Sequence, residues 1–263
     1  MKLNIVPART GIQWVKLGVH TFFRQPLALA GLFFMFSMGV FVLSVIPLIC
    51  PVVAVILMPA ATLGMIAATA EAAQGRFPMP WVLVSAFRAG HKRGKAMLVL
   101  GAIYAVVLLV IVMLTSLLVA PIQPSGPPAT SADAAVPVEA HPALFVAMAL
   151  QLPFAVLFAH APALVHWYGV SPVKSLFFSA VAFWRNLGAF VMFGVTWLLF
   201  MFAAGAVLSI VFALFGTAPT PQAMAPVALL MLAMMSTSMY FTFRDSFVPD
   251  SPTDNPPEEP PNE

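Results

Sequence analysis

Few side chains in the apolar stretches of this sequence can do chemistry, and His160 is the most deeply placed of them. His166 lies near the end of the same stretch, and Glu71 lies at the end of an earlier one. An ionisable side chain in such a setting is by default a candidate functional group. A neutral histidine can equally be satisfied by one hydrogen bond from a neighbouring helix. We therefore favour a packing role for His160, and we expect Glu71 to pair with Arg76 or another loop base.

Motifs for catalysis and for cofactor binding are absent from the sequence. It has no HExxH pattern, no other close cluster of histidine, cysteine and carboxylate residues, and no Walker-type phosphate loop. It also has no GxSxG pattern, and its apolar stretches contain none of the carboxylates that proton-coupled carriers use. These absences predict a protein that is not an enzyme, with no catalytic, cofactor-binding or metal-binding residues and no cofactor.

A dense basic group lies in the middle of the chain and consists of Arg88, His91, Lys92, Arg93 and Lys95. A base near an anionic membrane surface contributes about 1 kcal/mol to binding. We therefore predict that these residues bind lipid headgroups, with anionic membrane lipids as the partner and no nucleic acid. The alternative stays open that the charges only set the orientation of the chain during membrane insertion.

The elements that carry these residues must be membrane helices, because 61% of the 263 residues are hydrophobic and only 8% are charged. Soluble domains have about 25% charged residues. Six apolar runs lack Asp, Glu, Lys and Arg, and each is near the ~20 residues that a helix needs to cross a bilayer. The predicted fold class is all-α: a polytopic domain (27–243) of six transmembrane helices, with short amphipathic helices on the cytoplasmic side. The expected spans are 27–46, 52–70, 96–120, 143–165, 188–215 and 226–243.

The basic residues predict the orientation. All twelve Lys and Arg residues fall on one side of a six-span topology, so the positive-inside rule places both termini in the cytoplasm. Residues 1–26 then form a cytoplasmic amphipathic segment. The proline-rich outer loop 121–142 and the acidic, proline-rich tail 245–263 are expected to be disordered.

Amphipathic stretches precede the first, third and fifth spans and predict surface helices. In the first stretch Gln13, Lys16, His20 and Arg24 share one face, and Trp14 is expected among the lipid headgroups. Each stretch ends in an aromatic–arginine pair, namely Phe23-Arg24, Phe87-Arg88 and Trp184-Arg185. This pattern suggests three parallel repeats of surface helix, span, turn and span.

Small residues spaced four apart line one face of the second and fourth spans. Such faces allow helices to approach closely, so we predict helix-packing roles for them. They are Ala60, Gly64 and Ala68 in the second span and Ala155, Ala159 and Ala163 in the fourth. The same spans contain Pro59, Pro153 and Pro162, which can kink them.

Short motifs along nearly the whole chain resemble those of a known family. They are Phe22-Phe23-Arg24-Gln25-Pro26-Leu27, Ile46-Pro47-Leu48, Gly75-Arg76-Phe77-Pro78, Ala161-Pro162-Ala163-Leu164-Val165 and Phe243-Arg244-Asp245-Ser246-Phe247. The family they resemble consists of proteobacterial inner-membrane proteins known only as uncharacterised transmembrane proteins. The resemblance implies a six-helix protein of the bacterial inner membrane and implies no activity.

Two hypotheses about function remain. The first is a non-catalytic membrane protein that acts as a scaffold, an assembly factor or an organiser of lipid. The second is a transporter or channel for an apolar or neutral solute, with its site between the kinked second and fourth spans. A polar cavity would favour transport, and a solidly packed bundle would favour the first hypothesis.

Overall fold

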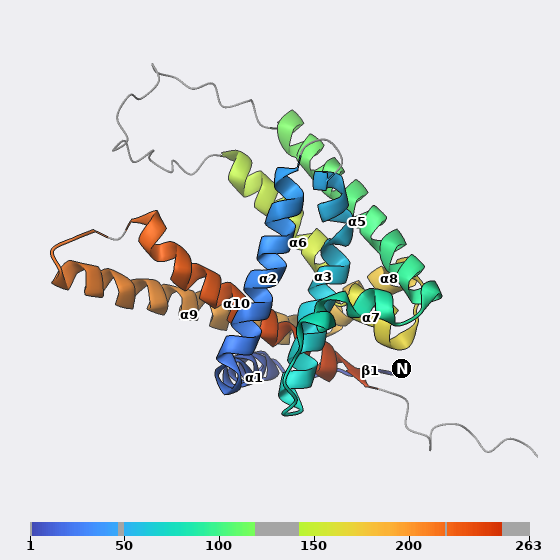
Figure 1. Cartoon of the computed structure of the whole chain (residues 1–263), viewed down its shortest axis with the longest axis horizontal. Helices are drawn as coiled ribbons and strands as arrows, with labels where there is room; N and C mark the ends of the chain where they lie inside the picture. The colour runs from blue at the N-terminus through green and yellow to red at the C-terminus, as the bar shows by residue number, and fades with distance from the viewer. Residues whose placement is uncertain (1, 47–49, 119–141, 219, 249–263) are drawn as a thin grey trace, which may run out of the picture.

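The computed structural model describes residues 2–46, 50–118, 142–218 and 220–248 (Figure 1). Helices dominate these residues, and two short strands lie at their two ends. In chain order the elements are β1 (Lys2–Leu3), α1 (Thr10–Arg24), α2 (Pro26–Val45), α3 (Cys50–Ala73), η1 (Pro80–Val84), α4 (Ser85–Arg88), α5 (His91–Leu118), α6 (Pro142–Ala159), α7 (Ala161–Tyr168), α8 (Pro172–Arg185), α9 (Leu187–Leu214), α10 (Pro221–Ser246) and β2 (Phe247–Val248). Almost all of the predicted outer loop lies outside the described residues, as does the predicted tail beyond residue 248.

Within the described residues, six helical segments are long and apolar enough to cross a membrane, which confirms the predicted all-α, six-span fold class. They are Pro26–Val45, Pro51–Ala73, His91–Leu118, Phe145–Tyr168, Leu187–Leu214 and Pro221–Ser246. The third begins at His91 rather than at residue 96, and the sixth begins at Pro221 rather than at residue 226. A helix can begin before its apolar run, because its backbone hydrogen bonds do not depend on apolar side chains. The first turn of α5 contains His91, Lys92 and Arg93, so a search for apolar residues left it out of the span.

The fourth span consists of two helices, α6 and α7, that meet at His160. Pro162 stands in the first turn of α7, where a missing backbone N–H is tolerated, but it cannot continue the hydrogen bonding of α6. α7 ends at Gly169, whose φ of 64° is the left-handed conformation that favours glycine. Pro59 and Pro153, by contrast, lie inside α3 and α6, which continue through them.

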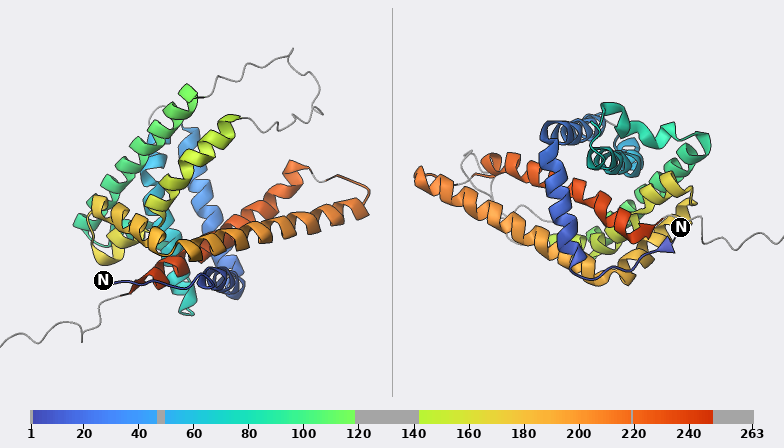
Figure 2. Two further views of the ribbon diagram at one scale, coloured as in Figure 1. Left: turned by 180° about the vertical axis from the view of Figure 1, so that it is seen from behind. Right: turned by 90° about the horizontal axis from the view of Figure 1, so that it is seen from below.

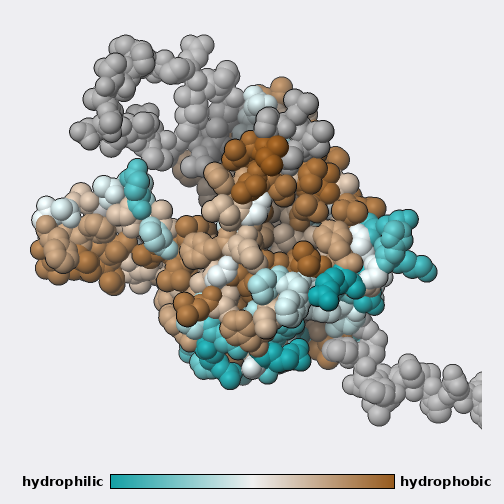
Figure 3. Space-filling view, viewed as in Figure 1, coloured by the Kyte–Doolittle hydropathy of each residue, from teal (hydrophilic) through white to brown (hydrophobic). Residues whose placement is uncertain are grey.

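The first four spans pack side by side, whereas α9 and α10 form a hairpin that diverges from them (Figures 1 and 2). α3 is central and contacts α2, α5 and α10. α9 is the span least covered by the rest of the protein, because only 6% of its most apolar stretch is buried. Hydrophilic side chains gather instead at the end of the molecule that carries α1 (Figure 3).

The two ends of the described chain pair with each other. β1 and β2 form an antiparallel pair in which Lys2 lies opposite Val248 and Leu3 lies opposite Phe247. Both ends therefore lie on the same side of the spans, as an even number of crossings requires. We call this side the terminal face; that it is cytoplasmic stays a prediction from the charges. Asp245 to Val248, which we assigned to the acidic tail, belong to α10 and β2.

A short helical element precedes each pair of spans in the chain. It packs on the previous pair of spans rather than on its own, and the first such element packs on the last pair. α1 packs on α9 and α10, η1 and α4 pack on α3, and α8 packs on α6 and α7. This cyclic order is compatible with three repeats related by an axis along the membrane normal. The equivalence of the three units stays a prediction.

The prediction for Trp14 was wrong. Its side chain is fully buried, with its ring 5.2 Å from that of Phe190, and its Nε1 donates a 2.9 Å hydrogen bond to Oδ2 of Asp245. The expected polar face of α1 is exposed, at Gln13, Lys16, His20 and Arg24. The opposite face meets protein rather than lipid. An amphipathic pattern indicates one apolar environment and does not distinguish a membrane surface from a protein core.

Two glycines explain how α1 enters the core. A Cβ atom at Gly11 would collide with the carbonyl oxygen of Ala189 in α9, and one at Gly18 would collide with Oγ of Ser238 in α10. Both glycines are on the buried face of α1, two helical turns apart. They bring the backbone of α1 against both helices of the diverging hairpin and hold its base in place.

Candidate functional site

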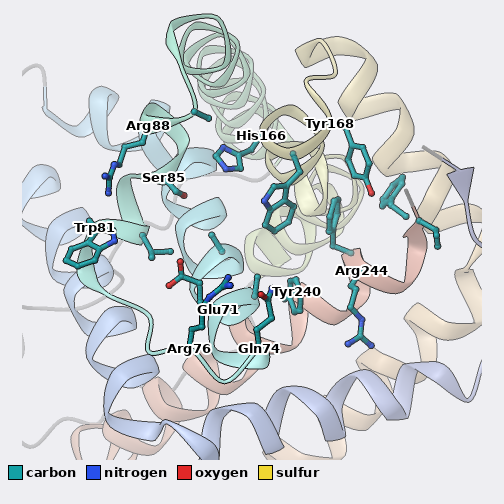
Figure 4. Close-up of a pocket in the computed structure, with 18 residues that line it drawn as sticks. Glu71, Gln74, Arg76, Trp81, Ser85, Arg88, His166, Tyr168, Tyr240 and Arg244 are labelled. Atoms are coloured by element: carbon teal, nitrogen blue, oxygen red, sulfur yellow. The ribbon is translucent and has the colours of Figure 1, made fainter. Parts of the chain in front are cut away.

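A hollow of about 840 Å³ opens at the terminal face, between the ends of three spans and the η1–α4 segment (Figure 4). We call it the terminal pocket. α3 contributes Ala67, Ala70 and Glu71, and the segment that follows contributes Gln74, Arg76, Trp81, Val82, Ser85, Arg88 and Ala89. α7 contributes His166, Trp167 and Tyr168, and the chain around the end of α10 contributes Tyr240, Phe243, Arg244, Phe247 and Val248. Its volume is in the range of small-molecule and cofactor sites.

The pocket wall formed by η1 and α4 is held against α3 by close backbone packing. The chain reverses after α3 at Gly75, whose φ of 78° suits glycine, and Pro80 begins η1. A Cβ atom at Gly64 would lie 2.6 Å from Cα of Leu83, so only glycine allows η1 to lie this close. Val82 is buried in the same contact. The predicted small face of the second span thus meets the loop segment at Gly64.

An aromatic cluster fixes the opposite wall. Phe243 is buried, and its ring centroid lies 5.1 Å from that of Trp167 and 5.3 Å from that of Phe247. Trp167 in turn meets Tyr240 at 6.5 Å. Offset and edge-on contacts of this kind leave aromatic side chains little rotational freedom. The pocket therefore has a rigid wall at the level where α7 and α10 reach the terminal face.

The charges of the pocket are unbalanced. Arg76 and Arg88 are exposed, and Arg244 lies 2.8 Å from Asp245 in an ion pair. Glu71 is half-buried and has no ion pair among the described residues. The expectation that Glu71 pairs with Arg76 was therefore wrong, although both residues line the pocket.

Two polar atoms of the pocket residues are buried and have no hydrogen-bond partner among the described residues: Oγ of Ser85 and Nδ1 of His166. Leaving a buried polar atom unsatisfied costs about 1–3 kcal/mol, so such atoms mark unused hydrogen-bonding capacity. Neither atom hydrogen-bonds the other, so His166 does not hold Ser85 as a general base holds a nucleophile. The arrangement suits binding through hydrogen bonds better than covalent catalysis.

The residues predicted to bind headgroups divide between the pocket and its surroundings. Arg88 lines the pocket, at the end of α4. His91, Lys92, Arg93 and Lys95 occupy the first turns of α5 and are exposed, after a turn at Gly90. Arg93 is close enough to His166 for a Coulomb interaction between the two side chains. The sequence thus indicated the basic rim, and the pocket beside it was missed.

The predicted packing residues also divide. Ala60, Gly64 and Ala68 are buried in the second span. In the fourth span Ala163 is buried and Ala159 half-buried, whereas Ala155 is exposed, which does not match a packing role. The neighbouring Phe154 is buried against Tyr104 of α5, so Ala155 lies on a different, uncovered face of α6. The glycines at the closest helix contacts, Gly11, Gly18 and Gly101, were missed because they are not spaced four apart.

His160 lies outside the pocket residues and is almost completely buried. Its Nε2 is 3.1 Å from Oγ1 of Thr242, and the rings of Phe190 and Phe247 each lie 5.7 Å away. The one hydrogen bond of its side chain and the aromatic rings around it suit the packing role favoured above, while its buried Nδ1 has no partner among the described residues. Among the described residues no group of three or more His, Cys, Asp or Glu could hold a metal ion.

Comparison with known proteins identifies the setting rather than the activity. No protein-family model and no solved structure matches the chain. Over 256 residues, 94% of each chain, it is 32% identical to a probable inner membrane protein of Burkholderia thailandensis. This identity extends over nearly the whole length, and the six apolar helices suit the same location. The chain is therefore a multi-pass inner-membrane protein and belongs to the family of six-helix proteobacterial inner-membrane proteins that its motifs resemble.

Proposed function

We propose that this protein is a non-catalytic organiser of membrane lipid that holds a phospholipid headgroup in the terminal pocket, on the cytoplasmic side. The observation that carries the proposal is that Arg88 and the residues with the unpartnered atoms Ser85 Oγ and His166 Nδ1 all line one pocket at the end of the spans. A guanidinium and two hydrogen-bonding groups suit a phosphate.

The position and lining of the pocket support a lipid ligand. All the basic loops lie at the level of the terminal face, which is the headgroup level if that face is cytoplasmic. Ala67, Ala70 and Val82 give the pocket an apolar part beside its polar one. A phospholipid presents the same division between its phosphate and the start of its acyl chains. The exposed bases from His91 to Lys95 would draw anionic lipid towards the rim.

A transporter of an apolar or neutral solute is the second candidate. The observation in its favour is that the polar pocket lies between the second, fourth and sixth spans, near the broken fourth span. Transporter sites usually lie near the middle of the bilayer, whereas these lining residues stand at the ends of α3, α7 and α10. We therefore prefer headgroup binding.

Lipid retention by matched arginine variants tests the proposal. Wild type, Arg88→Gln and Arg185→Gln proteins would be purified in one mild detergent, and their bound phospholipid measured by mass spectrometry. Both arginines are exposed and follow an aromatic residue, but only Arg88 lines the pocket. We expect Arg88→Gln to retain several-fold less phospholipid and Arg185→Gln to match wild type. Equal retention by all three proteins would refute headgroup binding at this site.

A further inference from the structure

The terminal pocket contains a carboxylate that a simple phosphate site would not need. Glu71 lines it, is half-buried, and has no ion pair among the described residues. A negative group beside a bound phosphate repels it unless a positive group lies between them. Ala67, Ala70 and Glu71 lie on one face of α3 and all line the pocket, so Glu71 is part of its wall.

Aromatic rings accompany this carboxylate. Trp81, Trp167 and Tyr240 line the same pocket, and Trp167 is fixed by Phe243 at 5.1 Å. The faces of such rings attract cations, and tryptophan does so most strongly. A carboxylate with tryptophan and tyrosine rings is a suitable environment for an ammonium group.

The two kinds of polar group lie apart in the pocket. Figure 4 shows Glu71, Gln74 and Arg76 in one part of it and Ser85 and His166 in another, with Arg88 on the far side of Ser85 from His166. The first part has the carboxylate of Glu71 in α3, the amide of Gln74 just after it and the guanidinium of Arg76, which forms no ion pair with that carboxylate. The second part has the two unpartnered hydrogen-bonding atoms, with the guanidinium of Arg88 at its edge. A ligand that satisfies both parts has a phosphate at one end and an amine at the other.

We propose that the pocket recognises a phosphoethanolamine group, with its phosphate at Ser85, Arg88 and His166 and its ammonium at Glu71. This inference rests on the proposed function and names the headgroup that function would select. A primary ammonium donates three hydrogen bonds to Glu71 and Gln74, whereas a choline headgroup donates none. A glycerol headgroup carries no positive charge, so Glu71 disfavours it. The source is phosphatidylethanolamine in the membrane rather than free phosphoethanolamine in the cytoplasm, because apolar residues line part of the pocket.

Competition among lipids with identical acyl chains tests the selectivity. The full chain would be placed in nanodiscs with equal amounts of phosphatidylethanolamine, phosphatidylglycerol and phosphatidylcholine, and the lipids that remain bound after detergent extraction would be counted by native mass spectrometry. We expect wild type to retain phosphatidylethanolamine about two- to fivefold over the other two, which is the value of one solvent-accessible ion pair. Glu71→Gln should remove that preference, and Glu71→Asp should keep part of it.

The controls separate this inference from the proposed function. Arg88→Gln should lower retention of all three lipids, because it weakens the contact with the phosphate they share. If retention depends on Arg88 but wild type shows no preference, or Glu71→Gln keeps it, the amine selectivity is wrong and headgroup binding stands. If retention does not depend on Arg88, the proposed function itself is wrong. Free O-phosphoethanolamine is the last probe; if it stabilises the protein against heat while none of the lipids is retained, the ligand is soluble and the lipid source is refuted.

Discussion

Replacing Gly64 with alanine should force the η1–α4 segment away from α3. A Cβ atom at this position lies 2.6 Å from Cα and 2.7 Å from the carbonyl oxygen of Leu83. Because these are backbone atoms, no side-chain rotation relieves the overlap. The segment that must move carries Val82 and Ser85, which line the terminal pocket. The substitution therefore changes stability and pocket shape together.

The magnitude follows from two opposing effects. Overpacking of this kind costs about 1–3 kcal/mol, and the better helix propensity of alanine returns about 0.5–1 kcal/mol. Gly64→Ala should therefore lose about 0.5–2 kcal/mol of unfolding free energy. Gly31 in α2 is a matched control, because nothing lies within 4 Å of a Cβ atom built there. Gly31→Ala should gain about 0.5–1 kcal/mol.

Thermal unfolding in one detergent would compare the two variants with wild type. At about 2–4 °C per kcal/mol, Gly64→Ala should melt several degrees below Gly31→Ala. It should also retain less phospholipid, since Ser85 is displaced. Gly64→Leu should enlarge both effects. If Gly64→Ala melts at or above the temperature of Gly31→Ala, η1 does not press on α3 and the account of this pocket wall is wrong.

Three further predictions follow from the topology, the basic rim and α1. In a Cys50→Ala background, a cysteine at Ala129 should react with an impermeant thiol reagent added outside and one at Ser251 should not; the reverse pattern would invert the orientation. A variant with Arg88, Lys92, Arg93 and Lys95 all changed to Gln should retain less phosphatidylglycerol and cardiolipin once its topology is verified, and unchanged retention would leave these bases only an orienting role. Trp14→Phe removes the 2.9 Å hydrogen bond to the Asp245 carboxylate and should cost about 1.5–3 kcal/mol, measured as a lower melting temperature. A Trp14→Phe protein that melts like wild type would contradict the buried position of α1.

Hydropathy alone predicted the six spans, because a helix is the simplest way for a continuous apolar segment to satisfy its backbone in lipid. The exposed face of α1 was also predictable from the spacing of Gln13, Lys16 and His20. What covers the other face was not. The bond from Trp14 to Asp245 joins residues 231 positions apart, and no local pattern encodes such a partner.

The candidate site shows the same limit. Arg88 was predicted from the density of bases around it, which is a local property. The terminal pocket depends on four separate segments, from α3 to β2, so it exists only after the spans have packed. Glu71 was expected to pair with Arg76, five residues away, but no ion pair joins them although both line the pocket. Closeness in sequence indicates which side chains can meet and does not determine the rotamers that they adopt.

Photo-crosslinking would show which residues lie next to the bound headgroup. Phosphatidylethanolamine with a photoreactive group next to its headgroup would be incorporated into membranes that contain the full chain, irradiated, and the crosslinked peptides identified by mass spectrometry. Headgroup binding in the terminal pocket predicts crosslinks concentrated in residues 71–89 and 166–168, and predicts that Arg88→Gln reduces them but Arg185→Gln does not. Crosslinks spread evenly over the terminal face, or equally strong in the Arg88→Gln protein, would contradict it.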